Sequence, residues 1–377
     1  MGDFRLGSIL GFEIRIDFSW FIIFFLILWT FSFAVFPLNF PGLSTVTYIL
    51  MGVAGTLLFF GSLVAHELSH SLIARTKGIP VEGITLFIFG GMARTRMEAE
   101  DPGDEFVIAG IGPVTSIAIG VVLWLIGWFG AQAGWSVAIT GAAQYLAFLN
   151  IILAVFNLLP GFPLDGGRLF RAAVWKFTGD VTKATRWAST GGKWFGYLLV
   201  ALGIFQALSG AIVGGLWLVF IGWFLRNAAT ASYEQHLLQR VLEGVQAREA
   251  MTREPETVPP GLSLQELVDE HFLRRRYHAF PVTEQGRPLG IITLAQVKQV
   301  PREEWPRRTV AEAMTPAGEG NTVRPDERMP RVLDKLERSE ARRVLVARDG
   351  HLEGIITAGD VAGWLQRAQE LGRREAA

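Results

Sequence analysis

The chain has 377 residues, enough for two or three domains, and half of its residues are hydrophobic, including 12 Trp and 27 Phe. Its net charge of zero conceals an uneven distribution, because residues 1–226 contain only 13 of the 35 Lys and Arg and 12 of the 35 Asp and Glu. We therefore expect an integral membrane part followed by a soluble part. Neither part is basic enough to indicate nucleic-acid binding, and the lack of cysteine excludes disulfides and thiolate metal sites.

The N-terminal part begins with a polar–apolar alternation over residues 12–17, which predicts a short strand at the membrane surface. Residues 18–36 are apolar enough to form a first membrane span. A second stretch without charge, residues 48–65, leads directly into the sequence His66-Glu67-Leu68-Ser69-His70. The first charge after this motif is Arg75, so the motif itself is expected inside the second span.

This motif predicts a zinc-protease centre. On an α-helix, residues i and i+4 share one face, so His66 and His70 can bind one zinc ion together. Glu67 then lies beside the open position of the metal, where a base can activate water. Ionisable residues are costly within a bilayer, so their presence there indicates a functional site. The plainer alternative is a pair of core histidines held by hydrogen bonds.

Residues 81–93 read as a β-hairpin whose apolar strand, 84–89, is bounded by glycines. An exposed strand edge beside a protease centre could bind an extended substrate by β-addition. This makes Phe89, Gly90 and Gly91 candidate substrate-binding residues. A hairpin with a purely structural role is the alternative.

Two further apolar stretches, residues 106–129 and 135–159, predict the third and fourth spans. The fourth ends in residues 157–168, where two prolines and several glycines stop the helix and leave an unwound segment that presents Asp165. Taken alone, Asp165 could serve as a helix cap. The segments 194–208 and 211–225 are short for spans, so they predict either tilted helices or a re-entrant hairpin.

The distribution of Lys and Arg predicts the orientation. Basic residues occur near the N-terminus, in 75–105, in 165–193 and from Arg226 onwards, so the positive-inside rule makes these regions cytoplasmic. The second and fourth spans then both end on the cytoplasmic face. This brings Asp165 to the depth of the two histidines, where all three side chains can bind zinc.

The soluble part contains an internal repeat with a period of about 64 residues. Ala250-Met251-Thr252 recurs as Ala313-Met314-Thr315, and Gly290-Ile291-Ile292-Thr293 recurs as Gly354-Ile355-Ile356-Thr357. Each copy also holds a helical segment, a strand and a closing helix, so the copies are expected to be tandem α/β modules. We divide the chain into a membrane domain, 1–226, a linker helix, 227–245, and two modules, 246–304 and 305–377.

The membrane part resembles the site-2 protease family of intramembrane zinc metalloproteases. The match rests on His66-Glu67-x-x-His70 and on a second motif, Asn157-x-x-Pro160-x-x-Pro163-x-Asp165-Gly166, with support from Gly90-Gly91 and Ala109-Gly110-x-Gly112-Pro113. The resemblance implies one catalytic zinc ion held by His66, His70 and Asp165, with Glu67 as the base. It further implies that Asn157 helps to hold or polarise the scissile carbonyl. Members of the family cut transmembrane substrates, for example anti-sigma factors.

The soluble part resembles a pair of cystathionine-β-synthase (CBS) domains, modules that often bind adenine nucleotides and associate as dimers. The resemblance rests on Gly354-Ile355-Ile356-Thr357-Ala358-Gly359-Asp360 and implies that Thr357 and Asp360 contact a ribose. The first copy keeps Thr293 but has Gln296 in place of the Asp, which weakens the case for a nucleotide there. A plain structural role for these threonines is to cap the helix that follows.

The expected fold is therefore multi-domain, with a polytopic α-helical membrane domain of about six spans and short membrane-surface β-strands, followed by an α/β tandem CBS domain pair. The expected function is hydrolysis of transmembrane proteins in the cell membrane by one Zn2+ per chain. The cytoplasmic CBS pair is expected to sense AMP, ADP or ATP and to form a homodimer. The alternative is a CBS-gated transporter or channel, but a conduction path has no need of a base between two i, i+4 ligands.

Overall fold

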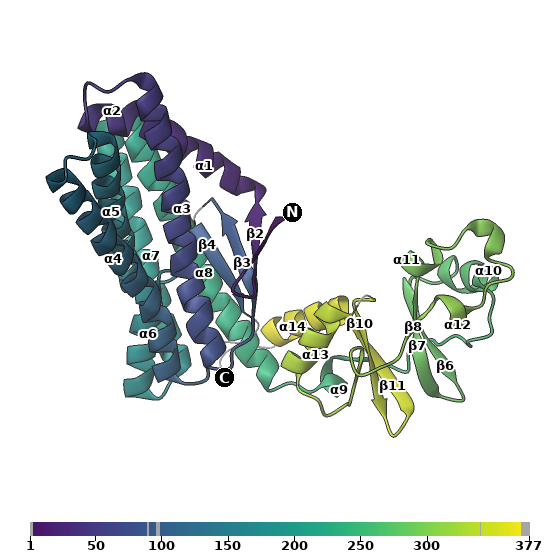
Figure 1. The fold of residues 1–377 in the computed structure, drawn as a ribbon. Helices are drawn as coiled ribbons and strands as arrows, with labels where there is room; N and C mark the ends of the chain where they lie inside the picture. The colour runs from purple at the N-terminus through teal and green to yellow at the C-terminus, as the bar shows by residue number, and fades with distance from the viewer. Residues whose placement is uncertain (1–2, 89, 96–98, 340, 371–377) are drawn as a thin grey trace. The chain divides into compact units, whose positions relative to one another are not determined.

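The computed structural model describes residues 3–88, 90–95, 99–339 and 341–370 of the chain (Figure 1). The chain divides into two compact units, Met1–Glu234 and Gln235–Ala377. The helix α8, Ile212–Glu243, contains the point of division.

The first unit is mainly helical. Its other helices are α1 (Phe18–Thr30), continued by the π-helical turn η1 (Phe31–Val35) and by α2 (Phe36–Asn39), then α3 (Thr45–Thr76), α4 (Pro102–Gln132), α5 (Val137–Asn157), α6 (Asp165–Thr178) and α7 (Val181–Leu208). Within the described residues, six helical stretches are long and apolar enough to cross a membrane: Phe18–Asn39, α3, α4, α5, α7 and α8. The expectation of about six spans is confirmed.

The last two spans are longer than the apolar segments 194–208 and 211–225 indicate. Helix α7 has 28 residues and α8 has 32. The apolar pattern misses their full length because polar turns extend α7 before Trp194 and α8 after Leu225, while the backbone remains helical. Each helix is therefore long enough to span, and a re-entrant hairpin is not needed to accommodate these segments.

A four-stranded sheet packs beside α3, the helix that contains His66 and His70. Its order is β1-β2-β3-β4, and the strands are β1 (Asp3–Ile9), β2 (Phe12–Asp17), β3 (Val81–Phe87) and β4 (Gly90–Thr95). The central pair β2 and β3 is parallel, and the two outer pairs are antiparallel hairpins. One apolar face, which includes Phe12, Ile14 and Ile84, packs on Leu68 of α3. The sheet is thus fixed to the helical turn that carries the two histidines.

Helix α4 contacts α3, α5 and α6, so it lies between the elements that carry the predicted metal ligands. Small buried residues of α4, namely Ala109, Gly112, Ser116 and Gly120, permit this close approach. Pro113 has no N–H to donate to the carbonyl of Ala109. The backbone hydrogen bonding of α4 is therefore interrupted beside these small residues.

The second unit is built from short elements. Its helices are α9 (Ala247–Ala250), α10 (Leu264–Glu266), η2 (Leu267–Phe272), α11 (Leu294–Val297), η3 (Arg302–Glu304), α12 (Val310–Ala313), α13 (Met329–Arg338) and α14 (Ala358–Glu370). Its strands are β5 (Thr252–Arg253), β6 (Ala279–Glu284), β7 (Arg287–Thr293), β8 (Thr315–Pro316), β9 (Thr322–Val323), β10 (Arg343–Arg348) and β11 (His351–Thr357). They form two sheets, β5-β11-β10-β9 and β6-β7-β8.

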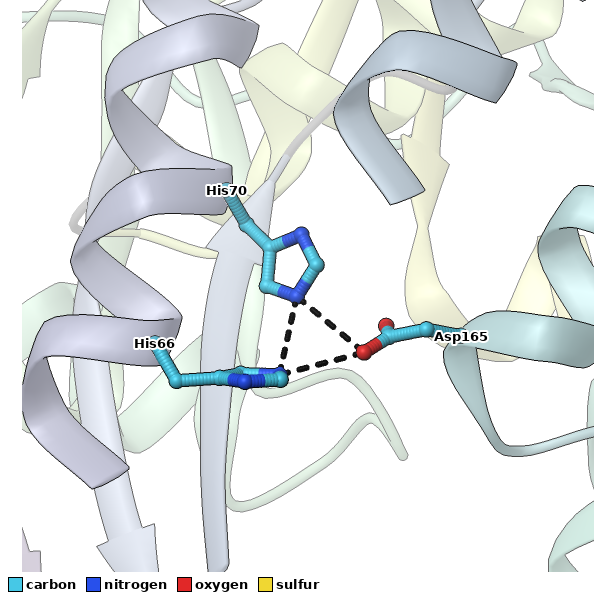
Figure 2. A group of neighbouring side chains, drawn as sticks. All are labelled: His66, His70 and Asp165. Carbon is cyan, nitrogen blue, oxygen red and sulfur yellow. Dashed lines mark hydrogen bonds and ion pairs between the residues drawn. The ribbon is translucent and has the colours of Figure 1, made fainter. Parts of the chain in front are cut away.

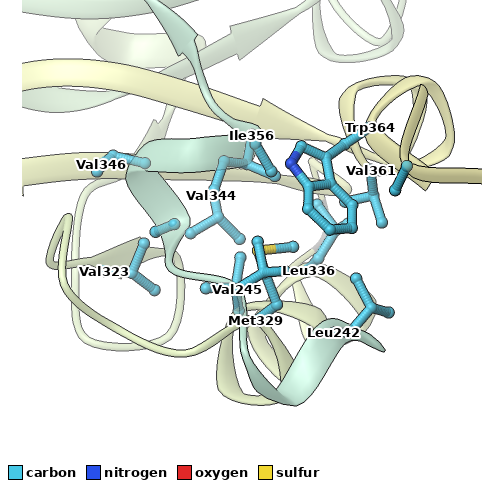
Figure 3. Packing of buried hydrophobic residues seen from close by; sticks show 14 residues of the cluster. Leu242, Val245, Val323, Met329, Leu336, Val344, Val346, Ile356, Val361 and Trp364 are labelled. Atoms are coloured by element: carbon cyan, nitrogen blue, oxygen red, sulfur yellow. The ribbon is translucent and has the colours of Figure 1, made fainter. Parts of the chain in front are cut away.

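The two sequence copies exchange their first strands. Strand β5 of the first copy pairs with β11 of the second, and β8 of the second copy pairs with β7 of the first. The cores follow the same exchange, because Ala247 and Ala250 of the first copy belong to the cluster that contains Val344, Ile356 and Trp364 of the second copy (Figure 3). The packed modules are therefore not the same as the contiguous sequence repeats.

Candidate metal centre

Three predicted ligands, from α3 and the start of α6, meet inside the first unit (Figure 2). His66 Nε2 lies 3.1 Å from Asp165 Oδ2, and His70 Nε2 lies 3.3 Å from the same oxygen. The two imidazole nitrogens are 3.2 Å apart. Among the described residues, this is the one group of His, Asp and Glu side chains close enough to hold a metal ion.

This triangle has the dimensions of one face of a zinc coordination tetrahedron. With metal–ligand bonds of about 2.0–2.1 Å, neighbouring ligand atoms in a tetrahedral site lie about 3.3 Å apart. The three measured separations fall close to that value. Three protein ligands leave a fourth position open, which is the arrangement of catalytic rather than structural zinc sites.

Helix α4 fixes the orientation of both imidazole rings. His70 Nδ1 lies 2.6 Å from the backbone carbonyl oxygen of Ile108, and His66 Nδ1 lies 2.8 Å from Ser116 Oγ. Since a carbonyl oxygen can only accept, His70 Nδ1 carries a proton, and in the neutral form of the ring the Nε2 lone pair is directed at the Asp165 carboxylate. Two electron-rich atoms that face each other are stabilised by a cation between them, so the donor set fits a bound metal.

Gly112 is the point where α4 approaches the rings most closely. A Cβ atom at this residue would lie 2.6 Å from His66 Nε2 and still closer to His70 Nε2. Both distances are shorter than a carbon–nitrogen contact allows, so only glycine leaves room for the two ligand nitrogens. The space beside the two ring nitrogens is therefore kept open by a residue outside the candidate ligand set.

Asp165 is the first residue of α6, and Leu164 is its N-cap residue. This differs from the expectation that Asp165 lies within the unwound segment, and its carboxylate makes no capping hydrogen bond. The helix dipole favours a negative side chain in this first turn. The preceding loop is held on α7, where the Phe162 N–H donates to the Ala188 carbonyl oxygen at 3.1 Å.

A buried ion pair joins α6 to α4 one turn and a half beyond Asp165. Arg171 Nε donates to Glu105 Oε1 at 2.7 Å, and the pair is almost fully withdrawn from solvent. The Arg171 guanidinium also stacks 5.2 Å from the ring centre of Phe162 in the loop before Asp165. At the end of α3, Lys77 pairs with Asp104 of α4 at 2.7 Å. These contacts tie together the helices that carry the ligands.

Glu67 is partly buried and lies within electrostatic reach of both histidines and of Asp165. The edge strand β4 passes beside it, because a Cβ atom on Gly91 would lie 3.0 Å from Glu67 Cδ. Gly90 starts this strand with φ at +135°, a backbone conformation that favours glycine. Phe89, the third predicted substrate-binding residue, lies outside the described residues.

Asn157 is the last residue of α5 and is partly buried. Its side chain makes no hydrogen bond within the described part of the chain, so the structure does not link it to the three ligands by a direct bond. Its predicted role at the scissile carbonyl stays a prediction.

The predicted nucleotide residues of the second unit all take part in helix caps. Thr357 Oγ1 donates to Asp360 Oδ2 at 2.7 Å, while Thr252 Oγ1 donates to the other carboxylate oxygen at 2.7 Å. In the first copy, Thr293 Oγ1 donates to Gln296 Oε1 at 2.8 Å, and Thr293 is buried. Thr357 is partly exposed and is thus more accessible than its equivalent, Thr293.

Comparison with known proteins identifies both parts of the chain. The profile of Peptidase family M50 matches residues 54–142 and 130–200, and that of the CBS domain matches residues 247–302 and 310–367. The chain is 34% identical, over 95% of its length and 91% of the relative's, to a protein of Mycobacterium tuberculosis named zinc metalloprotease Rip3. The chain belongs to peptidase family M50. It is a metallopeptidase with two CBS domains, and the transporter alternative is not favoured.

The chain is also similar to other relatives and to solved structures. This M50 peptidase is 29% identical to zinc metalloprotease MJ0392 of Methanocaldococcus jannaschii over 88% of the chain and 90% of the relative. A solved site-2 protease from Methanocaldococcus jannaschii is 28% identical, with a TM-score of 0.44, and the match covers 62% of this chain and 95% of that one. The CBS domain of a bacterial CNNM/CorC Mg2+ transporter in complex with ATP is 23% identical, with a TM-score of 0.31, over 35% of this chain and 96% of that one.

Proposed function

We propose that this chain is an intramembrane zinc endopeptidase of the site-2 protease type that cuts transmembrane proteins, such as anti-sigma or signalling proteins. The observation that carries the proposal is the triangle of His66, His70 and Asp165, which has zinc dimensions and lies between apolar spans. We assign one Zn2+ per chain to these three residues, and we assign the role of base to Glu67.

The reaction divides among the residues of the site. When bound, zinc acidifies water and stabilises the negative charge that develops on a peptide carbonyl oxygen. Glu67 accepts the proton of the attacking water and delivers it to the leaving amine. We assign to Asn157 a hydrogen bond from its amide to the scissile carbonyl oxygen, which would be made only once substrate is bound.

The substrate must be unwound before it is cut, because a helix hides its carbonyl groups in hydrogen bonds. We infer that the edge strand β4 offsets this cost by pairing with the unwound segment, next to Glu67. Gly90 and Gly91 would leave the edge of this strand accessible to the substrate backbone, and Phe89 stays a predicted substrate-binding residue.

The second unit is proposed to regulate the peptidase. An adenine nucleotide, AMP, ADP or ATP, would bind with its ribose on Thr357 and Asp360, and with Thr293 at the equivalent position of the first copy.

We also propose that the membrane domain ends at residue 226, the linker helix at 245 and the first CBS domain at 304. Two chains would form a homodimer through their CBS domains. The N-terminus and the CBS pair would face the cytoplasm. The positive-inside rule supports this orientation, because the segments 75–105 and 165–193 are rich in Lys and Arg.

Substitution of the base tests the catalytic proposal. We expect Glu67→Gln, in proteoliposomes with a labelled single-span peptide, to retain zinc but to cleave at least about 10²-fold more slowly. The exposed residue Glu100 provides the matched control, since Glu100→Gln removes the same charge near the start of α4. Cleavage by Glu67→Gln at the rate of the control variant would refute the mechanism.

A further inference from the structure

The soluble unit exposes a short segment of unusual composition. Within its described residues, only two large hydrophobic side chains are largely exposed: Leu273, at 75%, and Tyr277, at 54%. They flank three consecutive arginines, Arg274, Arg275 and Arg276, which are all exposed. We call residues 273–277 the arginine loop.

The arginine loop is held in place at its base. Phe272 packs against Phe280 of the core at 5.2 Å between ring centres. The Leu273 N–H donates to the Val268 carbonyl oxygen at 3.0 Å, and the Arg275 N–H donates to the His271 carbonyl oxygen at 2.9 Å. The chain therefore buries Phe272 and exposes the next residue, Leu273, through a defined backbone path rather than through a loose tail.

A carboxylate fixes one of the three arginines. Glu256 lies 3.1 Å from Arg275 Nε and 3.2 Å from His271 Nδ1, which anchors the loop to the preceding segment. Arg274 and Arg276 make no ion pair with any described residue. Two positive charges between two exposed apolar side chains thus remain available to a partner.

This combination matches the surface of an anionic bilayer. Arginines attract acidic lipid headgroups, while an exposed leucine and tyrosine gain by entering the boundary between headgroups and acyl chains, a position that Tyr favours. The same chain carries six candidate membrane spans, so its soluble unit is tethered to a bilayer and meets the lipid surface at high effective concentration.

We propose that the arginine loop is a docking site for anionic phospholipid headgroups, which holds the CBS pair at the membrane surface. Arg274 and Arg276 would contact headgroup phosphates, and Leu273 and Tyr277 would insert into the interface. This inference does not depend on the catalytic proposal, because it requires only the membrane spans.

A fluorescent label beside the loop tests the proposal in the full-length chain. The sequence contains no cysteine, so Glu270→Cys supplies a unique thiol on an exposed residue three positions before Leu273. The labelled protein would be placed in nanodiscs of phosphatidylcholine, with or without phosphatidylglycerol, that contain a headgroup-linked nitroxide quencher. We expect quenching with phosphatidylglycerol, little without it, and a decrease as added salt screens the charges.

Two pairs of substitutions separate loop docking from a general charge effect. Each arginine near an anionic surface changes the docked-to-free ratio about fivefold, so Arg274→Gln with Arg276→Gln should lower this ratio about 25-fold. Arg307→Gln with Arg331→Gln removes the same charge from exposed sites elsewhere in the unit and should leave quenching nearly unchanged. Leu273→Ser should also reduce quenching.

Three results would overturn the proposal. The first is no quenching in nanodiscs that contain phosphatidylglycerol. The second is quenching in pure phosphatidylcholine as strong as with phosphatidylglycerol, and the third is the same loss of quenching from both pairs of arginine substitutions. The first would instead point to a protein partner for the loop.

Discussion

At the scale of single residues, the candidate site depends on groups outside the triangle of His66, His70 and Asp165. Gly112 is the clearest case, because a methyl group there would occupy the space between the two ligand imidazoles. Ser116 and the Ile108 carbonyl group act through the opposite ring nitrogens and fix the direction in which the ligand nitrogens point.

We predict that Gly112→Ala abolishes zinc binding without unfolding the membrane domain. Alanine favours a helix more than glycine does by about 1 kcal/mol, so the loss would come from the clash with the ligand nitrogens and not from the helix. Gly110→Ala is the matched control, since its Cβ atom would lie 3.7 Å from Leu169 Cδ2, an ordinary contact. Zinc content measured for both purified variants checks this, and equal zinc in the two would contradict it.

Ser116→Ala is expected to weaken zinc affinity about 10- to 100-fold, the usual effect when the hydrogen-bond partner of a ligand histidine is removed. The neighbouring Thr115→Ala serves as the control, because Thr115 Oγ1 donates to the Ile111 carbonyl oxygen of its own helix. Competition with a chelator measures both affinities. A Ser116→Ala variant that holds zinc as tightly as Thr115→Ala would remove Ser116 from the site.

The sequence predicted which side chains meet in the candidate site better than it predicted their surroundings. His66, Glu67 and His70 follow from helical spacing alone, and Asp165 follows from the direction of two spans, so no tertiary detail was needed to place them. The contacts of Ser116 and Ile108 depend on the rotation of α4 against α3, which the uniformly apolar pattern of α4 does not encode. For the same reason, the pattern does not reveal which glycine of α4 faces the rings.

At the scale of elements, the position of α6 depends on the buried pair Glu105–Arg171. Arg171→Met removes the charge-assisted hydrogen bond to this buried carboxylate while Arg168 Nε still lies 3.9 Å from it, so we expect the variant to destabilise the protein by about 1.5–3 kcal/mol. Lys183→Met is the control, since Lys183 and Asp180 form an exposed pair of the same kind on α7. Thermal unfolding in detergent measures the difference. Similar midpoints for the two variants would contradict a structural role for the buried pair.

The apolar pattern also determined how well each element could be predicted. Strand β2 coincides with the alternating residues 12–17, because one face of the strand is buried and the other is not. Helix α7 could not be delimited, since its first turns are amphipathic and only its later part is uniformly apolar. The exchange of β5 and β8 between the CBS copies was not predicted, because a two-residue strand carries no period.

At the scale of the whole molecule, the regulatory proposal predicts a nucleotide that binds the second unit. Calorimetry on the full-length protein should detect AMP, ADP or ATP, and Asp360→Asn should bind at least about tenfold more weakly, since it loses a charge-assisted hydrogen bond to the ribose. Glu353→Gln, on β11, is the control. Absence of heat with all three nucleotides would reduce the CBS pair to an interaction module.

The central claim is that one zinc ion joins α3 to α6 inside the membrane domain. Elemental analysis of the full-length wild type and of Asp165→Ala, purified in detergent and competed with a chelator, tests it most directly. We predict about one zinc per chain in the wild type and a large loss of zinc in the variant, because two imidazoles alone do not complete a catalytic site. Folded wild-type protein without zinc, or an Asp165→Ala variant with undiminished affinity, would contradict it.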